Sequence, residues 1–301
     1  MSNIDERLLK PPVARAAYSD RTAWLMAEMS RLAYHNFDQD NVPDEMVNEM
    51  AGFKFQLVST FDNEGTQAFL SKRDSDKIAI LAFRGTENDP RDQKANYNAR
   101  FYSDNGAKIH DGYNRAFLNI EQAVREQAEK LNGYRLYITG HSMGGALALI
   151  ATRALNSDNI AACYTFGSPR VGSSEFGDAI KPPIYRIINS ADYVTMMPPT
   201  WPVNLLVTFC SFIPVPYLRK WVLDLLNSIK GYAHHGDMRY LTHCGPDYSE
   251  VRVITGLSFF EQARRFIRRV SSNLLAGCDD HYKTEYCAKL KAYAIKRLEE
   301  K

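Results

Sequence analysis

Short apolar runs that alternate with helical segments restrict the fold of this 301-residue chain more than any other feature. Almost continuous apolar runs are typical of strands in a sheet that is covered on both faces. The runs are residues 77–83, 135–139, 160–166 and 184–188. Helical segments lie between them, at 114–131, 143–155 and about 173–180. This alternation predicts an α/β fold with a mostly parallel central sheet flanked by helices.

The residues before these runs predict a different arrangement. Asp20 is a candidate N-cap for a helix, because apolar residues recur at helical spacing between Trp24 and Ala33. Two strands are expected at 53–60 and 66–71, joined by the turn sequence Asp-Asn-Glu-Gly. No break in composition separates two halves of the chain. We therefore expect one domain over residues 1–301, with an N-terminal helical segment over about 1–50.

Composition excludes several classes of protein. The chain is 45% hydrophobic and 24% charged, which is ordinary for a globular protein and excludes a disordered chain or a collagen. Its net charge of +2 gives no reason to expect a nucleic-acid partner. The five cysteines are an odd number without Cys-x-x-Cys spacing, so reduced thiols and no zinc site are expected. The charged N-terminus lacks a signal-peptide pattern, which predicts a cytoplasmic protein or export without a signal peptide.

The sharpest local motif is Gly-His-Ser-Met-Gly at residues 140–144, between a predicted strand and a helix rich in small residues. This context is that of a nucleophile elbow, a strained turn that exposes a serine at the carboxyl edge of a sheet. A Cβ at Gly140 or Gly144 would collide with the neighbouring helix or strand. Ser142 is therefore the candidate nucleophile.

A serine nucleophile needs an oxyanion hole, an acid and a base. The backbone N–H of Met143, at the helix start, is one candidate oxyanion donor, and Thr86, just past a strand, is the second. Asp192 follows the run at 184–188 and is the candidate acid, with a capping aspartate in a turn as the alternative. The order serine, acid, histidine leaves four candidate bases. They are His234, His235, His243 and His281.

The chain resembles the class 3 lipases, which are α/β-hydrolases typified by fungal triacylglycerol lipases. Five segments match motifs of that family in the correct order between about Ala27 and Leu290. They are AFRGT (82–86), IHDGYNRAF (109–117), YITGHSMGGALA (137–148), YTFGSPRVG (164–172) and RIINSADYVTMMPP (186–199). The resemblance implies an α/β-hydrolase fold, a lipid ester as substrate, and no metal or organic cofactor.

The resemblance also separates the histidines. Residues 280–286, which begin Asp-His and end in Tyr, look like the family element that bears the catalytic base, which implies His281. His234 is the second choice as the base, although its surroundings resemble a segment that is usually structural in the family. His141 is expected to shape the elbow, and His110 to make structural hydrogen bonds.

The implied activity is triacylglycerol or acylglycerol hydrolysis by a Ser142–Asp192–His281 triad through an acyl-enzyme. Thr86 and Met143 are the implied oxyanion donors. Phospholipase A and short-chain esterase are alternatives, and a catalytically inactive lipid-binding protein is a remoter one.

Two stretches depart from the family pattern. Residues 87–100 are strongly polar where fungal relatives carry an apolar, helical lid. An apolar insertion spans about 198–231, and its prolines interrupt it too often for a transmembrane helix. It is either a buried core insertion or a cap that contacts acyl chains or a lipid surface through 201–226. The cap is the interpretation we favour.

A last segment, residues 258–274, is amphipathic. Its apolar residues form one helical face, and four arginines lie largely off that face. Such a helix can lie on an anionic membrane, or it can dock on the core of its own protein. We favour the docked helix.

Overall fold

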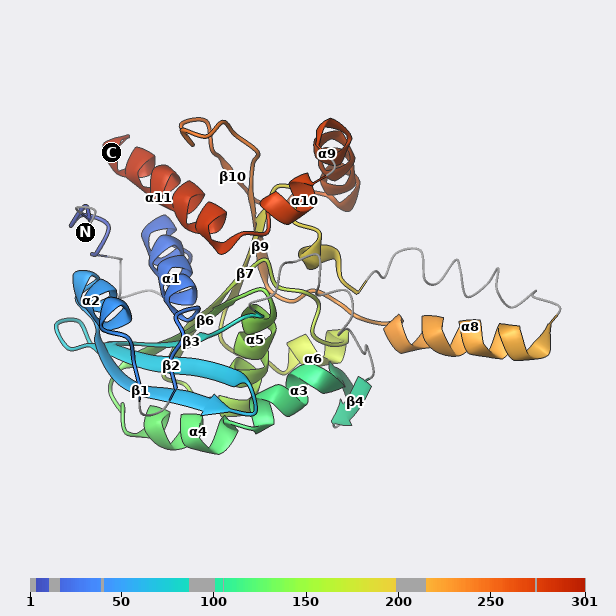
Figure 1. Cartoon of the computed structure of the whole chain (residues 1–301), viewed down its shortest axis with the longest axis horizontal. Coiled ribbons are helices and arrows are strands. Elements are labelled where there is room, and N and C mark those ends of the chain that lie inside the picture. The colour runs from blue at the N-terminus through green and yellow to red at the C-terminus, as the bar shows by residue number, and fades with distance from the viewer. Residues whose placement is uncertain are drawn as a thin grey trace.

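The computed structural model describes residues 4–10, 17–38, 41–86, 101–104, 106–198, 215–273 and 275–300. Within these ranges the central sheet has the order β1-β2-β3-β6-β7-β8-β9-β10, and β4 and β5 form a separate pair (Figure 1). The strands are β1 Gln56–Asn63, β2 Thr66–Arg73, β3 Ile78–Phe83, β4 Phe101–Asp104, β5 Ala107–His110, β6 Arg135–His141, β7 Ile160–Phe166, β8 Ile184–Asn189, β9 Asp237–Leu241 and β10 Val253–Ile254. All neighbours from β3 to β9 are parallel, whereas β1, β2 and β10 pair antiparallel.

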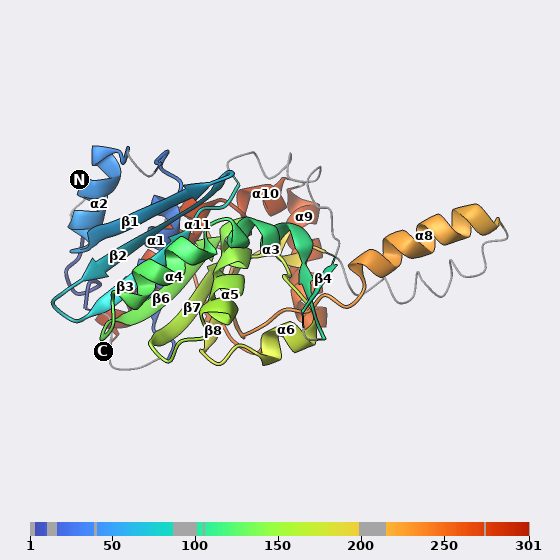
Figure 2. The ribbon, with the colours of Figure 1, turned by 90° about the horizontal axis from the view of Figure 1, so that it is seen from below.

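Helices cover both faces of this sheet (Figures 1 and 2). The α-helices of the described residues are α1 Asp20–Leu32, α2 Asp44–Gly52, α3 Asp111–Leu118, α4 Glu121–Glu129, α5 Met143–Leu155, α6 Ser174–Asp178, α8 Pro216–Ile229, α9 Phe259–Ser272, α10 Ala276–Asp279 and α11 Lys283–Glu299, of which α8 does not lie on the sheet. Alternate residues of β3 enter two separate apolar cores, because strand side chains alternate between faces. Ile80 packs with α1 and α11, and Leu81 packs with α3, α4 and α5. The predicted α/β-hydrolase fold is confirmed.

Three predicted features differ in detail from the observed ones. Residues 114–131 form two helices, α3 and α4, because Ile120 leaves the helical conformation at φ −121° and buries its side chain in the core. Asp20 is the first helical residue and Ser19 is the N-cap. The strands expected at 53–60 and 66–71 are the β1–β2 hairpin, in which β1 lies three residues later and β2 begins as predicted but ends two residues later.

The apolar insertion is described only in its second half. Residues 199–214 lie outside the described residues, as do residues 87–100, where the family lid was compared. The described part forms α8, which projects away from the sheet in both views, and Tyr217 near its start is 88% exposed (Figures 1 and 2). None of the described helices combines the length and the apolar character that crossing a bilayer demands.

No disulfide joins any two of the described cysteines. They are Cys163, Cys244, Cys278 and Cys287. Cys210 lies outside the described residues.

Candidate active site

Ser142 occupies the sharp turn between β6 and α5. Its φ of +58° lies in the left-handed region, which costs a non-glycine residue about 1–3 kcal/mol. Its N–H donates to the Phe166 carbonyl over 2.9 Å, and its own carbonyl accepts from Gly145 N over 3.0 Å. These bonds to the neighbouring strand and to the helix hold the strained turn in place, as a nucleophile elbow requires.

The two glycines of the elbow are required by close packing. A Cβ built on Gly144 would collide with the carbonyl oxygen of Phe83 on the neighbouring strand, and one on Gly140 with the carbonyl of Gly144. All of these obstacles are backbone atoms, which cannot rotate away. The crossing of strand and helix therefore depends on these two positions.

Replacing Gly144 by alanine is expected to lower the free energy of unfolding by at least about 2 kcal/mol, because the new methyl group overpacks a rigid crossing. Urea denaturation measures this change. Gly245→Ala is the matched control, since its new Cβ meets at 3.3 Å only the side chain of Asp247. Equal stability of the two variants would contradict the packing argument.

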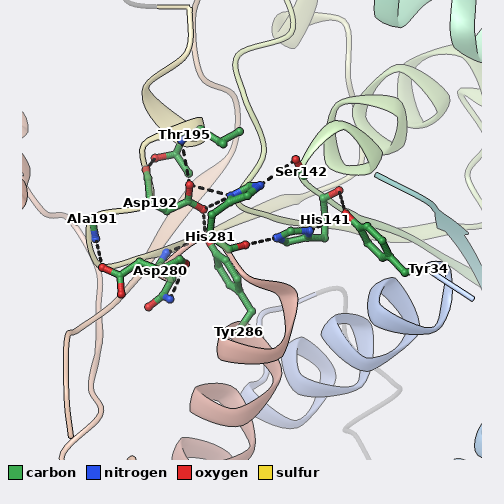
Figure 3. Close-up of polar contacts among 11 residues, drawn as sticks. Tyr34, His141, Ser142, Ala191, Asp192, Thr195, Asp280, His281 and Tyr286 are labelled. Carbon is green, nitrogen blue, oxygen red and sulfur yellow. Dashed lines mark hydrogen bonds and ion pairs between the residues drawn. The ribbon is translucent and has the colours of Figure 1, made fainter. Parts of the chain in front are cut away.

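His281 connects the predicted nucleophile and acid (Figure 3). Its Nδ1 lies 2.9 Å from both carboxylate oxygens of Asp192, and its Nε2 lies 3.0 Å from Ser142 Oγ. A carboxylate only accepts hydrogen bonds, so Nδ1 carries the hydrogen and Nε2 is left to accept from the serine hydroxyl. All three side chains are buried, with exposed fractions of 2% or less. The structure thus brings together the three residues predicted as a triad.

The Asp192 carboxylate is surrounded by donors. Val194 N donates to Oδ1 over 3.0 Å, and the Tyr286 hydroxyl donates to Oδ2 over 2.6 Å. Burial, together with the nearby Asp192 charge, raises the pKa of Tyr286 well above its usual value, so the phenol stays a donor. A Cβ at Gly167 would lie 2.6 Å from Oδ2, so this glycine makes room for the carboxylate.

His141 is hydrogen-bonded at both ring nitrogens (Figure 3). Nε2 donates to the backbone carbonyl of His281 over 2.7 Å, because a carbonyl can only accept. Nδ1 must then accept from the Tyr34 hydroxyl, 2.8 Å away. The residue beside the nucleophile therefore holds the main chain of His281 and is itself held by Tyr34, just after α1.

The predicted oxyanion donors lie beside the elbow. Met143 is the first residue of α5, so its N–H has no partner within the helix. Thr86 follows β3, and its hydroxyl lies 3.6 Å from Met143 Sδ. The two residues are thus in contact, with Met143 directly after Ser142.

Arg170 supports the loop that follows Asp192. Its backbone N–H donates to the Met197 carbonyl over 2.8 Å, and its guanidinium donates to the carbonyls of Met196 and, over 2.7 Å, Pro198. Burial lowers the pKa of this guanidinium to about 10, which leaves it charged at neutral pH. The charge therefore strengthens the hydrogen bonds that hold the loop.

Two other histidines that the sequence singles out, His234 and His110, make hydrogen bonds outside the triad. His234 Nε2 donates to the Thr195 carbonyl over 2.6 Å, so the second-choice base binds the backbone of the acid loop. His110 is the N-cap of α3 and accepts from Tyr113 N over 3.4 Å. His234 therefore supports the loop of Asp192, whereas His281 is the histidine that contacts Ser142.

Acid is expected to destabilise the protein through buried histidines. Burial lowers the pKa of His110 to about 4 and the pKa values of His141 and His234 well below the usual value of about 6.5. Below pH ~6.5 the unfolded chain binds more protons than the folded one, so this stability is complete above that pH and is lost as pH falls. The loss at pH 5 amounts to about 2 kcal/mol for His110.

Urea denaturation at pH 7 and pH 5 tests this expectation. His110→Gln should lose about 2 kcal/mol less than the unaltered chain over that interval, because glutamine does not titrate. An unfolding free energy that is equal at the two pH values would contradict the prediction.

Sequence reasoning missed several residues that hold the site. Tyr34 was not singled out, and neither was Lys289, whose buried ammonium donates to Asn189 Oδ1 over 2.7 Å. The Asn189 amide donates in turn to the Asp280 carbonyl over 2.7 Å, next to His281. Tyr286 was noted only as the last residue of a family motif, with no role assigned to it. The one local signal in the sequence was Lys289, a lysine on the apolar face of a helix, which indicates a buried polar partner.

Comparison with known proteins agrees with this geometry. Residues 80–201 match the family described as Lipase (class 3). A lipase of Rhizomucor miehei is 29% identical over 151 residues, which cover 44% of this chain and 41% of that protein. A secreted mono- and diacylglycerol lipase of Malassezia restricta is 32% identical over 105 residues, covering 31% of this chain and 35% of that protein. The chain thus spans less than half the length of the curated relatives it matches.

A solved structure extends the likeness in fold. The triacylglycerol lipase whose catalytic centre is described as a serine protease triad has a TM-score of 0.62 and 21% identity, and the match covers 91% of this chain and 98% of that one. Fold and site therefore define an α/β-hydrolase with a buried serine–histidine–aspartate arrangement. The resemblance to the class 3 lipase family that the motifs indicate is confirmed, and its recognisable segment is residues 80–201.

Proposed function

We propose that this protein is a serine hydrolase that cleaves carboxylic esters of lipids, as a triacylglycerol or acylglycerol lipase. One observation carries the proposal. A continuous chain of hydrogen bonds runs from Ser142 Oγ through His281 to the carboxylate of Asp192, with every donor and acceptor in the order that nucleophilic catalysis needs.

The first half-reaction transfers the acyl group to the enzyme. Ser142 Oγ attacks the ester carbonyl carbon while its proton passes to His281 Nε2. The carbonyl oxygen becomes an oxyanion, for which the N–H groups of Met143 and Thr86 are the proposed donors. The C–O bond to the alcohol then breaks, and the leaving oxygen takes the proton from His281. Asp192 stabilises the imidazolium throughout.

The second half-reaction regenerates the enzyme. His281 takes a proton from a water molecule, whose oxygen attacks the acyl-enzyme carbonyl. Collapse of this second tetrahedral intermediate releases the fatty acid, and the proton returns to Ser142 Oγ. Every proton that leaves a nucleophile is given back to a leaving group, so the cycle needs only water and ester.

The names of the relatives support an acylglycerol substrate, since one is a mono- and diacylglycerol lipase and another a triacylglycerol lipase. Phospholipase A and short-chain esterase activity use the same triad and are the alternatives. We also propose that the insertion contacts lipid through residues 201–226. The exposed Tyr217 supports this proposal at the described end of the stretch.

The test compares three substrates: a short soluble p-nitrophenyl ester, emulsified long-chain triacylglycerol and phospholipid vesicles. Ser142→Ala is the control on each. We expect the unaltered protein to hydrolyse the long-chain emulsion and the Ser142→Ala variant to lose this activity. Activity confined to the short ester would make the protein an esterase, and activity confined to vesicles a phospholipase. Silence on all three, with no labelling of Ser142 by an active-site phosphonate, would favour the inactive lipid-binding protein.

A further inference from the structure

The outward face of α9 combines exposed apolar and cationic side chains. Phe260, Arg264, Ile267 and Arg268 follow one another at helical spacing and so lie on one face. Phe260 is 78% exposed, Ile267 is 66% exposed, and the Arg264 side chain is 77% exposed. The sequence favoured a helix docked on the core. The structure shows one edge half-buried and this second apolar edge open to solvent.

Contacts on the opposite side fix the rotation of α9. Arg265 pairs with Glu261 over 2.7 Å, and its guanidinium lies 6.0 Å from the centre of the Tyr240 ring. Arg269 pairs over 3.4 Å with Asp280, whose side chain is only 4% exposed. Arg265 and Arg269 thus face the body through Tyr240 and Asp280, whereas the pair with Glu261 lies within the helix. Arg264 and Arg268 are exposed beside the apolar side chains, and Arg264 also lies 3.8 Å from Glu261.

This face is linked to the candidate active site. The Asp280 carboxylate that receives Arg269 also accepts from Ala191 N over 3.0 Å, next to the acid Asp192 (Figure 3). The next residue after Asp280 is His281. α9 and α10 lie next to each other, directly before the base in the chain (Figure 1). A surface bound by α9 would therefore be connected to the candidate active site through Arg269 and Asp280.

We propose that the α9 face formed by Phe260, Arg264, Ile267 and Arg268 binds an anionic lipid surface. Apolar side chains interleaved with arginines are what a helix in the plane of a membrane interface presents: the apolar groups enter the headgroup boundary and the arginines pair with lipid phosphates. Glu261 is the single acidic residue within α9. The choice of a lipid surface over an acidic protein also rests on the proposed lipase function.

Vesicle cosedimentation tests the proposal. It uses the Ser142→Ala chain, so that binding is measured without hydrolysis. A failure of the binding proposal can then be distinguished from a failure of the proposed activity. Vesicles of phosphatidylcholine with and without phosphatidylserine are compared at low and high salt. Arg264→Glu/Arg268→Glu is expected to weaken partitioning onto the anionic vesicles by about thirtyfold or more, and only at low salt, since each arginine near such a surface contributes about 1 kcal/mol.

Matched variants separate this face from the rest of the surface. Lys130→Glu/Lys296→Glu reverses the same number of charges at exposed sites, just after α4 and on α11, and should change partitioning much less. Phe260→Ser/Ile267→Ser should weaken binding at low and high salt alike, whereas Val47→Ser/Leu118→Ser, at exposed apolar sites elsewhere, should not. Circular dichroism and short-ester hydrolysis in the Ser142 background show that each variant folds.

Three results would overturn the proposal. Undiminished vesicle binding by both α9 variants would assign the lipid surface to another segment. Absence of binding by the chain with the intact α9 face, or an equal loss in the lysine control, would show that α9 is not a lipid-binding face.

Discussion

Replacing His281 by alanine is expected to lower kcat for ester hydrolysis by about a million-fold, as much as replacing Ser142. The imidazole is the only group that the structure places within hydrogen-bond distance of Ser142 Oγ among the described side chains. Without it the hydroxyl keeps its proton during attack and the leaving alcohol receives none. Residues of such a triad act as a unit, so either single loss removes the same contribution.

The decisive measurement is a double-variant cycle. Ser142→Ala/His281→Ala should be no slower than either single variant, because the shared contribution has already been lost. His243→Ala is the matched control. It removes a histidine that the sequence left as a candidate base, and kcat should stay unchanged. A loss below about a hundredfold in His281→Ala would require a different base.

Replacing Asp192 by asparagine is expected to lower kcat by about ten-thousand-fold at neutral pH. Three donors converge on the carboxylate: His281 Nδ1–H, the Tyr286 hydroxyl and Val194 N–H. An asparagine offers one acceptor oxygen and an amide that donates. His281 would then accept at Nδ1 and carry its hydrogen on Nε2, where it can no longer take the serine proton.

Steady-state kinetics with the short ester measure this loss, and urea denaturation shows whether the variant folds. Asp178→Asn, at an exposed position on α6, is the isosteric control and should retain full kcat. A folded Asp192→Asn enzyme that keeps more than a tenth of its activity would show that the carboxylate does not set the tautomer of the base.

The parts of the fold that could be predicted are those in which neighbours in sequence are neighbours in space. The β6–Ser142–α5 turn is one continuous segment, and its glycines indicate that strand and helix backbones approach closely there. The contacts of Tyr34 and Tyr286 join residues about a hundred positions apart, so no local sequence pattern predicts them. Helical periodicity likewise showed that α9 has an apolar edge, but which edges the body covers depends on Tyr240 and Asp280, which lie outside that helix.

The bond from His141 to the main chain of His281 has a consequence for fragments of this protein. The stretch that matches the class 3 lipase family ends at residue 201, so it holds Ser142 and Asp192 but neither His281 nor Tyr286. Tyr34, which donates to His141, precedes that stretch. A fragment cut to those boundaries would keep the segment that matches the family and lose the proposed proton acceptor. In the proposed mechanism, the smallest catalytic unit is therefore much longer than the matched segment.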